Sequence, residues 1–222
     1  ITEVVTYNAD KQKASVTYID DKTGKALKGD ELKGVTNAKS GYTTKSAIDT
    51  YTSLGYTLVS DDTKGNEIVF DNDDAVDQAF TVHLSHGKIT VTPEKPGKPG
   101  EPINPGEGSV NWPDDTDVKG LTDTVNRKIT YVMSDGSKAP EGTSQTLHFT
   151  ASKVIDKVTG KVLETETKWS ANQDFKDVDS PSVKGYTPDK TVVSNKNIAH
   201  DSDDITEVVT YNADKQKASV TY

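Results

Sequence analysis

The sequence predicts an α+β chain of two domains, in which the first domain combines strands with one helix and the second is mainly antiparallel β. Short segments alternate apolar and polar residues with the period of two that strands require. A single segment has clear helical spacing, and a proline-rich segment divides the chain near its middle. Only 32 % of the 222 residues are hydrophobic and 7 % aromatic, so we expect two modest cores rather than one large one.

The first domain is expected at residues 11–91 and begins with a hairpin. Residues 13–19 alternate apolar and polar side chains, and the polar stretch 20–24 ends on a glycine that suits a turn. Residues 25–35 form a weaker return strand because glycines interrupt them.

A helix is expected after this hairpin. Ala47, Ile48, Tyr51 and Leu54 fall at helical spacing, with Thr43 or Thr44 as N-cap and Gly55 as the residue that ends the helix. Further strands are predicted at residues 56–60, 67–70 and 78–85. The order ββαββ is that of a β-grasp, or ubiquitin-like, domain.

Prolines recur every third residue across the predicted boundary between the domains. Polyproline II has three residues per turn, so this spacing predicts a stiff, extended spacer within residues 92–120, which end in a softer acidic loop. We expect Trp112 in that loop to lie against a neighbouring domain. The prolines are Pro93, Pro96, Pro99, Pro102 and Pro105.

The second domain is expected at residues 121–212. Strands are predicted at residues 126–133, 145–151, 161–169, 190–194 and 205–211, and a weak helix at 172–178. The pattern IDxxTGKxL occurs at Ile19–Leu27 and again at Ile155–Leu163. Either the two domains share an ancestor and a β-grasp topology, or both hairpins use the same turn chemistry.

An eighteen-residue segment occurs twice, as Ile1–Tyr18 and as Ile205–Tyr222. The two copies start 204 positions apart, so the chain is one period of a tandem array plus the opening of the next. We therefore expect residues 1–10 to be the terminal strand of the preceding repeat. Residues 213–222 then begin the following repeat.

Charge and composition exclude several functions. A net charge of -9 argues against binding to nucleic acid or anionic lipid. The absence of cysteine excludes disulfides and thiolate metal sites. We expect no membrane span, because no run of 18 apolar residues occurs, and no signal peptide.

The sequence carries no catalytic motif, so we expect no enzyme, no catalytic residues and no cofactor. His83 and His86 are three positions apart on a predicted strand and point to opposite faces, which predicts two surface histidines rather than a metal site. Calcium is an alternative at one acidic cluster, although a solvated loop is the favoured interpretation. That cluster contains Asp71, Asn72, Asp73, Asp74 and Asp77.

Tyrosines are the only candidates for ligand binding, because an exposed ring can stack on a sugar. Tyr42 and Tyr56 are the weak candidates. Tyr51 has helical spacing with apolar neighbours, so we expect it in the core.

Several ordered motifs resemble a known family. From Ser15 to Gly87, the motifs SVTYIDDKTGKAL, SGYTT, DTYTSLGYTLVSDD and FDNDDAVDQAFTVHLSHG resemble the MucBP module of mucus-binding proteins. Residues Val125–Asn212, with KGYTPDK, are similar to the companion domain of the longer type of Mub repeat. The resemblance implies a β-grasp first domain in a cell-wall-anchored adhesin on the surface of Gram-positive gut bacteria. It supplies no binding residues.

Three functions stay open from the sequence. The first is an extracellular module that binds host mucin or other glycoproteins through glycans, with weak single sites and avidity from tandem, individually monomeric repeats. The second is an immunoglobulin-binding module that uses an exposed sheet edge. The third is a passive stalk spacer.

Overall fold

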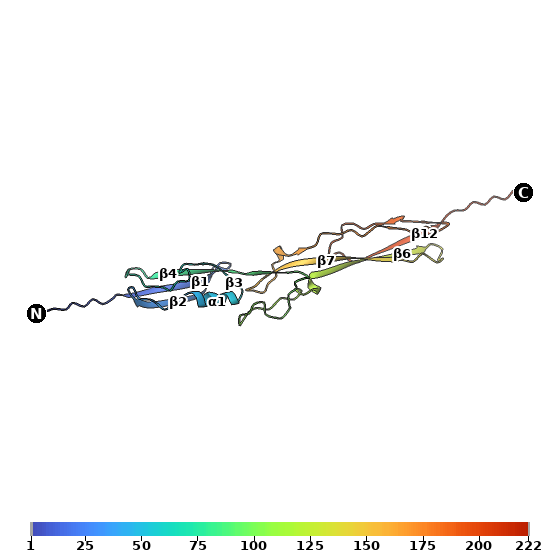
Figure 1. Ribbon diagram of the computed structural model, residues 1–222. Coiled ribbons are helices and arrows are strands. Elements are labelled where there is room, and N and C mark those ends of the chain that lie inside the picture. Colours follow the sequence, from blue (N-terminus) through green and yellow to red (C-terminus); the bar gives the residue numbers. More distant parts are fainter. Residues whose placement is uncertain (1, 222) are drawn as a thin grey trace. The chain divides into compact units, whose positions relative to one another are not determined.

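The computed structural model describes residues 2–221, so Ile1 and Tyr222, at the outer ends of the two repeated segments, lie outside the described residues. The chain is mostly β with one short helix (Figure 1). It forms two compact units, each built from separated segments. The first contains the chain up to residue 91 with residues 97–114 and 154–166, and the second contains the rest.

The first unit contains a four-stranded sheet in the order β2-β1-β4-β3. β1 is central: it pairs antiparallel with β2 and parallel with β4, and β4 pairs antiparallel with β3. The strands are β1 Lys11–Asp20, β2 Lys25–Val35, β3 Tyr56–Asp61 and β4 Gln78–His86, followed by β5 Lys88–Val91.

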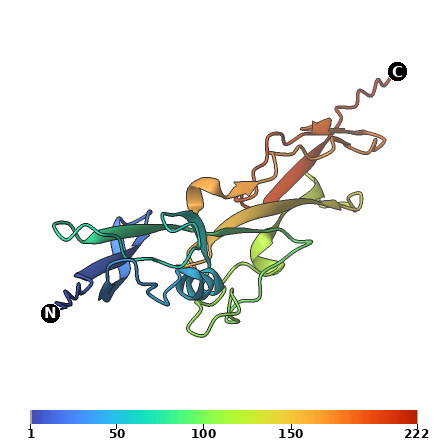
Figure 2. The ribbon, with the colours of Figure 1, turned by 60° about the vertical axis from the view of Figure 1, so that its left-hand side comes forward.

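The core of this unit confirms the predicted alternation, because Ala14, Val16 and Tyr18 of β1 are buried while their neighbours in the strand are more exposed. α1 Lys45–Ser53 begins after Thr44 as predicted, and Ala47, Ile48 and Tyr51 turn toward this core. Figure 2 shows α1 among the elements of the first unit. The chain leaves the helix at Gly55 with φ 102°, a conformation that favours glycine.

One predicted strand of the first unit is wrong. Residues 67–70 form no sheet strand and make only an isolated bridge between Val69 and Lys39. Ile68 and Phe70 are nevertheless buried, and their backbones bond to residues 37–42. The apolar residues of this segment are therefore buried as in a strand, but the segment that they bond to is an irregular loop.

The prediction of an extended polyproline II spacer is also wrong. Polyproline II has no internal hydrogen bonds, whereas here Gly100 N donates to Trp112 O and Ile103 N donates to Val110 O. The segment folds back on itself, and Trp112 is half-buried within that loop. Glycines between the prolines allow these turns, and Gly100 has φ 82°. The predicted limits of the domains, 11–91 and 121–212, stay a prediction.

The second unit is built on the strand order β10-β12-β6-β7. β6 pairs antiparallel with β7, as predicted, but parallel with β12, a pairing that the sequence did not predict. The last residues of β7, 154–156, belong to the first unit. The strands are β6 Thr122–Met133, β7 Thr143–Asp156, β8 Lys168–Trp169, β9 Val178–Asp179, β10 Tyr186–Pro188, β11 Val192–Val193 and β12 Ile205–Ala213.

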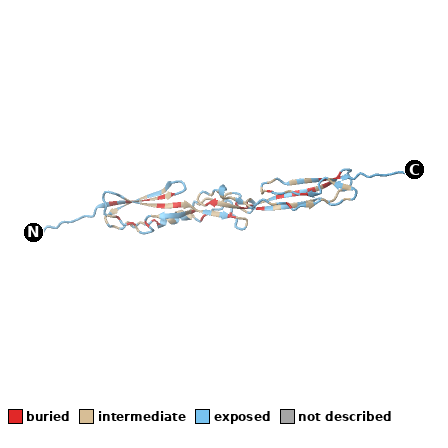
Figure 3. Cartoon of the chain, turned by 90° about the horizontal axis from the view of Figure 1, so that it is seen from above, coloured by how far each residue is buried: buried red, intermediate tan, exposed pale blue. Residues whose placement is uncertain are grey.

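The inward face of β6 forms the core of the second unit together with β12. Ile129, Tyr131 and Met133 pack with Val209 and Tyr211, and Figure 3 shows buried residues recurring along the strands. The same face also contains Arg127, which is fully buried. Its guanidinium donates to Asn195, Gln145 and the backbone of Lys176, so most of its polar groups are satisfied.

Two predictions for the later part of the chain are wrong. Residues 161–169 contain the short 3₁₀ helix Glu164–Glu166 and only two strand residues, β8. Residues 172–178 form no helix, and Gln173 instead bridges to Ile198. A second 3₁₀ turn, Lys119–Leu121, precedes β6. No helix in residues 2–221 has the length and apolar character needed to cross a membrane.

Candidate functional site

A groove in the first unit is the strongest candidate for ligand binding. It has a volume of about 540 Å³ and is formed by β2, the loop before α1 and α1 itself. Its walls combine two phenol rings, three aliphatic hydroxyl groups and one ammonium group. These belong to Tyr42, Tyr51, Thr43, Ser46, Thr50 and Lys28.

Hydrogen bonds fix one wall of the groove. Tyr42 Oη donates to Asp30 Oδ2 at 2.6 Å and lies 2.8 Å from Tyr18 Oη. Lys28 Nζ contacts the same Asp30 oxygen at 2.7 Å. Burial, together with the bonds to Asp30 and Tyr18, raises the pKa of Tyr42 far above its usual value, so the phenol stays protonated.

Hydrogen bonds donated to Asp30 keep its carboxylate ionised. Burial acts to raise the pKa of Asp30, but the hydrogen bonds from Lys28 and Tyr42 outweigh it and lower that pKa. The lysine and the carboxylate therefore largely neutralise one another. The groove has the size and mixed lining of a small-ligand site, and its rings and hydroxyls suit a neutral sugar.

The predicted tyrosines have different positions. Tyr42 lines the groove, whereas Tyr56 does not. Tyr56 packs edge-on against Tyr51, with ring centroids 5.6 Å apart, and against His86 at 5.4 Å. Tyr51, expected only in the core, is half-buried and contributes to both the core and the groove.

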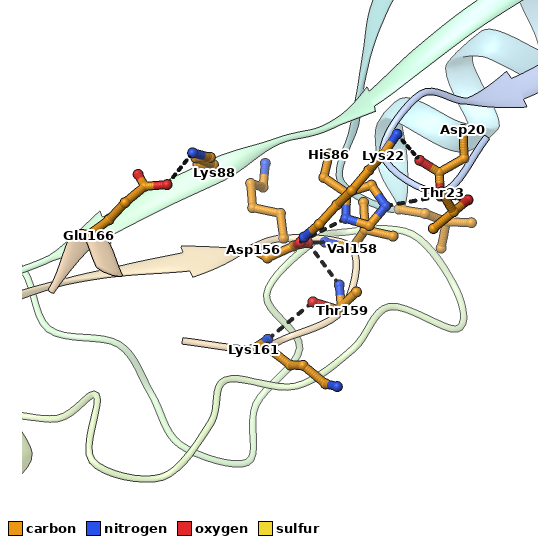
Figure 4. Close-up of polar contacts among 12 residues, drawn as sticks. Asp20, Lys22, Thr23, His86, Lys88, Asp156, Val158, Thr159, Lys161 and Glu166 are labelled. Atoms are coloured by element: carbon orange, nitrogen blue, oxygen red, sulfur yellow. Dashed lines mark hydrogen bonds and ion pairs between the residues drawn. The ribbon is translucent and has the colours of Figure 1, made fainter. Parts of the chain in front are cut away.

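A buried polar cluster in the same unit overturns the prediction of two surface histidines (Figure 4). The His86 side chain is only 7 % exposed and lies between two carboxylates. His86 Nδ1 is 2.7 Å from Asp156 Oδ2, and His86 Nε2 is 3.2 Å from Asp20 Oδ2. Lys22 Nζ reaches Asp156 at 2.5 Å. His83, in contrast, forms a partly exposed pair with Asp21.

The two carboxylates of this cluster come from the two IDxxTGKxL motifs, and both motifs form the same turn. Asp20 O accepts from Gly24 N, and Asp156 O accepts from Gly160 N. Both glycines have φ 68°, which explains why each motif needs glycine there. The turn prediction is therefore confirmed. The convergence of the two motifs on one histidine was missed, although the repeated motif and the histidine at the end of the strand were visible signals.

The cluster keeps its acids ionised. Burial acts to raise the pKa of Asp156, but hydrogen bonds from Lys22, His86 and backbone amides hold it well below its usual range. Asp20 behaves alike: burial opposes ionisation, yet bonds from Thr23, His86 and the Lys22 amide lower its pKa. These groups therefore form a network of mutually satisfied hydrogen bonds and ion pairs.

The acidic loop contains local hydrogen bonds. Asp73 N donates to Asp71 Oδ1, and Ala75 N donates to Asp73 Oδ1. Asp74 accepts from Gln12. Within residues 2–221, no three or more His, Cys, Asp or Glu side chains are grouped so that they could hold a metal ion.

Comparison with known proteins gives consistent matches. Residues 12–86 match a family model described as a mucin binding domain, and residues 116–215 match one described as a Muc B2-like domain. The chain is 31 % identical to the type 2 repeat of the mucus binding protein MUB from Lactobacillus reuteri, over 91 % of this chain and 100 % of that one, with a TM-score of 0.55. A structure described as Mub-RV is 28 % identical over 92 % and 100 %, with a TM-score of 0.67. The comparison with curated proteins gives no match.

Proposed function

Because this chain belongs to the family of mucus-binding protein repeats, we propose that it is a non-catalytic adhesin module that binds the glycans of mucin. The observation that carries this proposal is the Tyr42–Tyr51 groove. A pyranose ring presents an apolar face to an aromatic ring and hydroxyls to its surroundings. Tyr42 and Tyr51 supply the first contact, and Ser46 and Thr50 supply the second.

The topology of the first unit supports its assignment to the β-grasp class. The hairpin β1–β2, the helix and the pair β3–β4 follow one another, and β1 and β4 pair in parallel at the centre. We assign residues 121–212 to the companion domain of the family. In this proposal the repeat works outside the cell, on the surface of a bacterium, in a parent protein anchored to the cell wall.

Binding to purified mucin tests the proposal directly. The chain should bind intact mucin in surface plasmon resonance and lose that binding when the O-glycans are removed, because the groove contacts sugars rather than peptide. Binding that survives removal of the glycans would contradict a glycan site. If the chain bound neither form of mucin, the passive stalk spacer would be the better description.

An immunoglobulin site is the second candidate, favoured by the sheet edge. β2 is an edge strand of eleven residues, so one side of its backbone is available for pairing with another strand. Immunoglobulin fragments form a separate arm of the same experiment. If the chain bound immunoglobulin fragments but not mucin, immunoglobulin binding would replace mucin binding as the proposed function.

Avidity follows from the repeated segment if the parent contains tandem copies of this unit. Shallow sugar contacts are weak, and linking copies raises the apparent affinity by about 10²–10⁴ without a new contact. Chains of one, two and four repeats should therefore bind mucin with steeply rising apparent affinity. A flat series, in which one repeat already binds tightly, would contradict avidity.

A further inference from the structure

Each unit contains a parallel pairing between the strand that opens its main sheet and a strand much later in the chain. In the first unit, residues 14–20 of β1 pair with residues 78–84 of β4. In the second, residues 127–133 of β6 pair with residues 205–211 of β12. Each pairing has seven register positions, and we call these pairings the first and second parallel ladders.

Tension along the chain loads both ladders in shear. A pull on the chain ends draws β1 toward its N-terminus and β4 toward its C-terminus. Because the two strands run in the same direction, they must slide past one another, and the hydrogen bonds between them are loaded together. β6 and β12 are loaded in the same way, because they also run parallel to one another. An antiparallel pair pulled apart at its open end instead loses its bonds one after another.

We propose that the two parallel ladders are mechanical clamps, which keep each unit folded while the chain transmits tension. This is a function separate from ligand recognition, because it depends on strand direction and not on the groove. It suits any chain that is held at one end and bound at the other. Polar contacts beside each ladder also link its two strands.

A water-shielded polar contact links the two strands of the first ladder where β4 ends. Asp20 of β1 and His86 of β4 approach to 3.2 Å, with side chains 5 % and 7 % exposed (Figure 4). The second ladder is linked through one intermediate residue. Arg127 of β6 donates to Asn195, and Asn195 donates to Glu207 of β12. Such contacts are stronger away from water, so they add resistance to sliding.

The repeated segment connects one clamp directly to the next. β12 ends at Ala213, and the copy of β1 that follows it begins at Lys215, the equivalent of Lys11. Only Asp214 lies between them. In the tandem array proposed above, tension passes from the last strand of one repeat to the first strand of the next with no intervening loop to extend.

Single-molecule pulling on the full chain tests the clamp, and the absence of native cysteine allows handles to be attached at chosen positions. One variant combines Lys11→Cys with Ser85→Cys, so that β1 and β4 are sheared. The control combines Thr57→Cys with the same Ser85→Cys. Thr57 and Ser85 face one another in the antiparallel β3–β4 pair, so this pull opens that pair from its end.

We expect the shear geometry to rupture at a clearly higher force than the control, since all the hydrogen bonds of a ladder must break at once. The pair Thr124→Cys with Asn212→Cys applies the same test to the second ladder, with Thr124→Cys and His148→Cys as its opening control. Unchanged thermal melting confirms that each variant is folded. Equal forces in the two geometries would overturn the proposal, whether or not the chain binds mucin.

Discussion

Asp156 is an ionised carboxylate that is buried away from water, where a charge is costly in free energy unless it is paired. Its side chain is 1 % exposed, and it is stabilised by Lys22 and His86 together with the amides of Val158 and Thr159. The sequence predicted it only as a turn residue. Its burial depends on residues 154–166 joining the first unit, and no local pattern reports a contact over such a separation.

The variant Asp156→Asn should be less stable near pH 7 by about 1–3 kcal/mol, because it weakens charge-assisted hydrogen bonds to buried partners. The pKa of Asp156 is lower in the folded chain than in the unfolded chain. Its contribution to stability is therefore complete above the unfolded value of about 3.9 and is lost as the pH falls further. Urea denaturation from pH 7 to pH 3 should show a smaller acid-side loss of stability in the variant than in the parent.

Asp21→Asn is the matched control for this prediction. Asp21 pairs with His83 at 2.6 Å, but the two side chains are 34 % and 39 % exposed. An exposed pair contributes less than about 1 kcal/mol. Equal effects of the two variants would show that burial of Asp156 has no role in its contribution.

At the level of elements, strands and the helix with a strong local period could be predicted. β1, β2, α1 and β4 have nearly the predicted limits, because alternation and helical spacing are local properties. The prediction for the proline-rich segment failed because its conformation is set by hydrogen bonds to distant residues, such as the bond from Gly106 N to Ser53 O. The groove could be predicted only in part for the same reason. Tyr42 was identified from its residue type, but its grouping with Tyr51 and Lys28 depends on packing.

β2 shows why the glycines of a strand need individual explanations. The sequence suggested that they weaken the strand. Gly34 in fact leaves space for a buried ring, since a Cβ there would lie 2.2 Å from Phe70. At Gly29, in the same strand, such a Cβ would have no atom within 4 Å apart from its own residue and its two chain neighbours. One glycine is required by packing and the other is not.

Gly34→Ala should therefore destabilise the chain by about 1–3 kcal/mol, because the Phe70 ring must move. Gly29→Ala should be neutral or stabilising by up to about 1 kcal/mol, since it only restricts the unfolded chain. Thermal denaturation of both variants checks this prediction. A loss of stability at Gly29 as large as at Gly34 would show that backbone conformation, not the ring, decides.

At the level of the whole molecule, the net charge of -9 limits how the chain can hold a glycan. Long-range attraction to an acidic sugar is absent, so recognition has to come from short contacts within one site. The groove provides such contacts, with tyrosine rings and hydroxyls beside a lysine that is already paired to Asp30. These contacts support the proposal that mucin glycans bind in this groove.

Mucin binding by two variants of α1 tests this proposal. Thr50 lines the groove, whereas Thr52 lies on the same helix, is also exposed and does not line it. Thr50→Leu removes a hydroxyl from the groove and fills part of its volume, and Thr52→Leu makes the same chemical change outside it. A glycan site in this groove predicts that Thr50→Leu weakens binding to mucin roughly tenfold, or about 1.4 kcal/mol, while Thr52→Leu binds as the parent does. Equal binding by the two folded variants would contradict it.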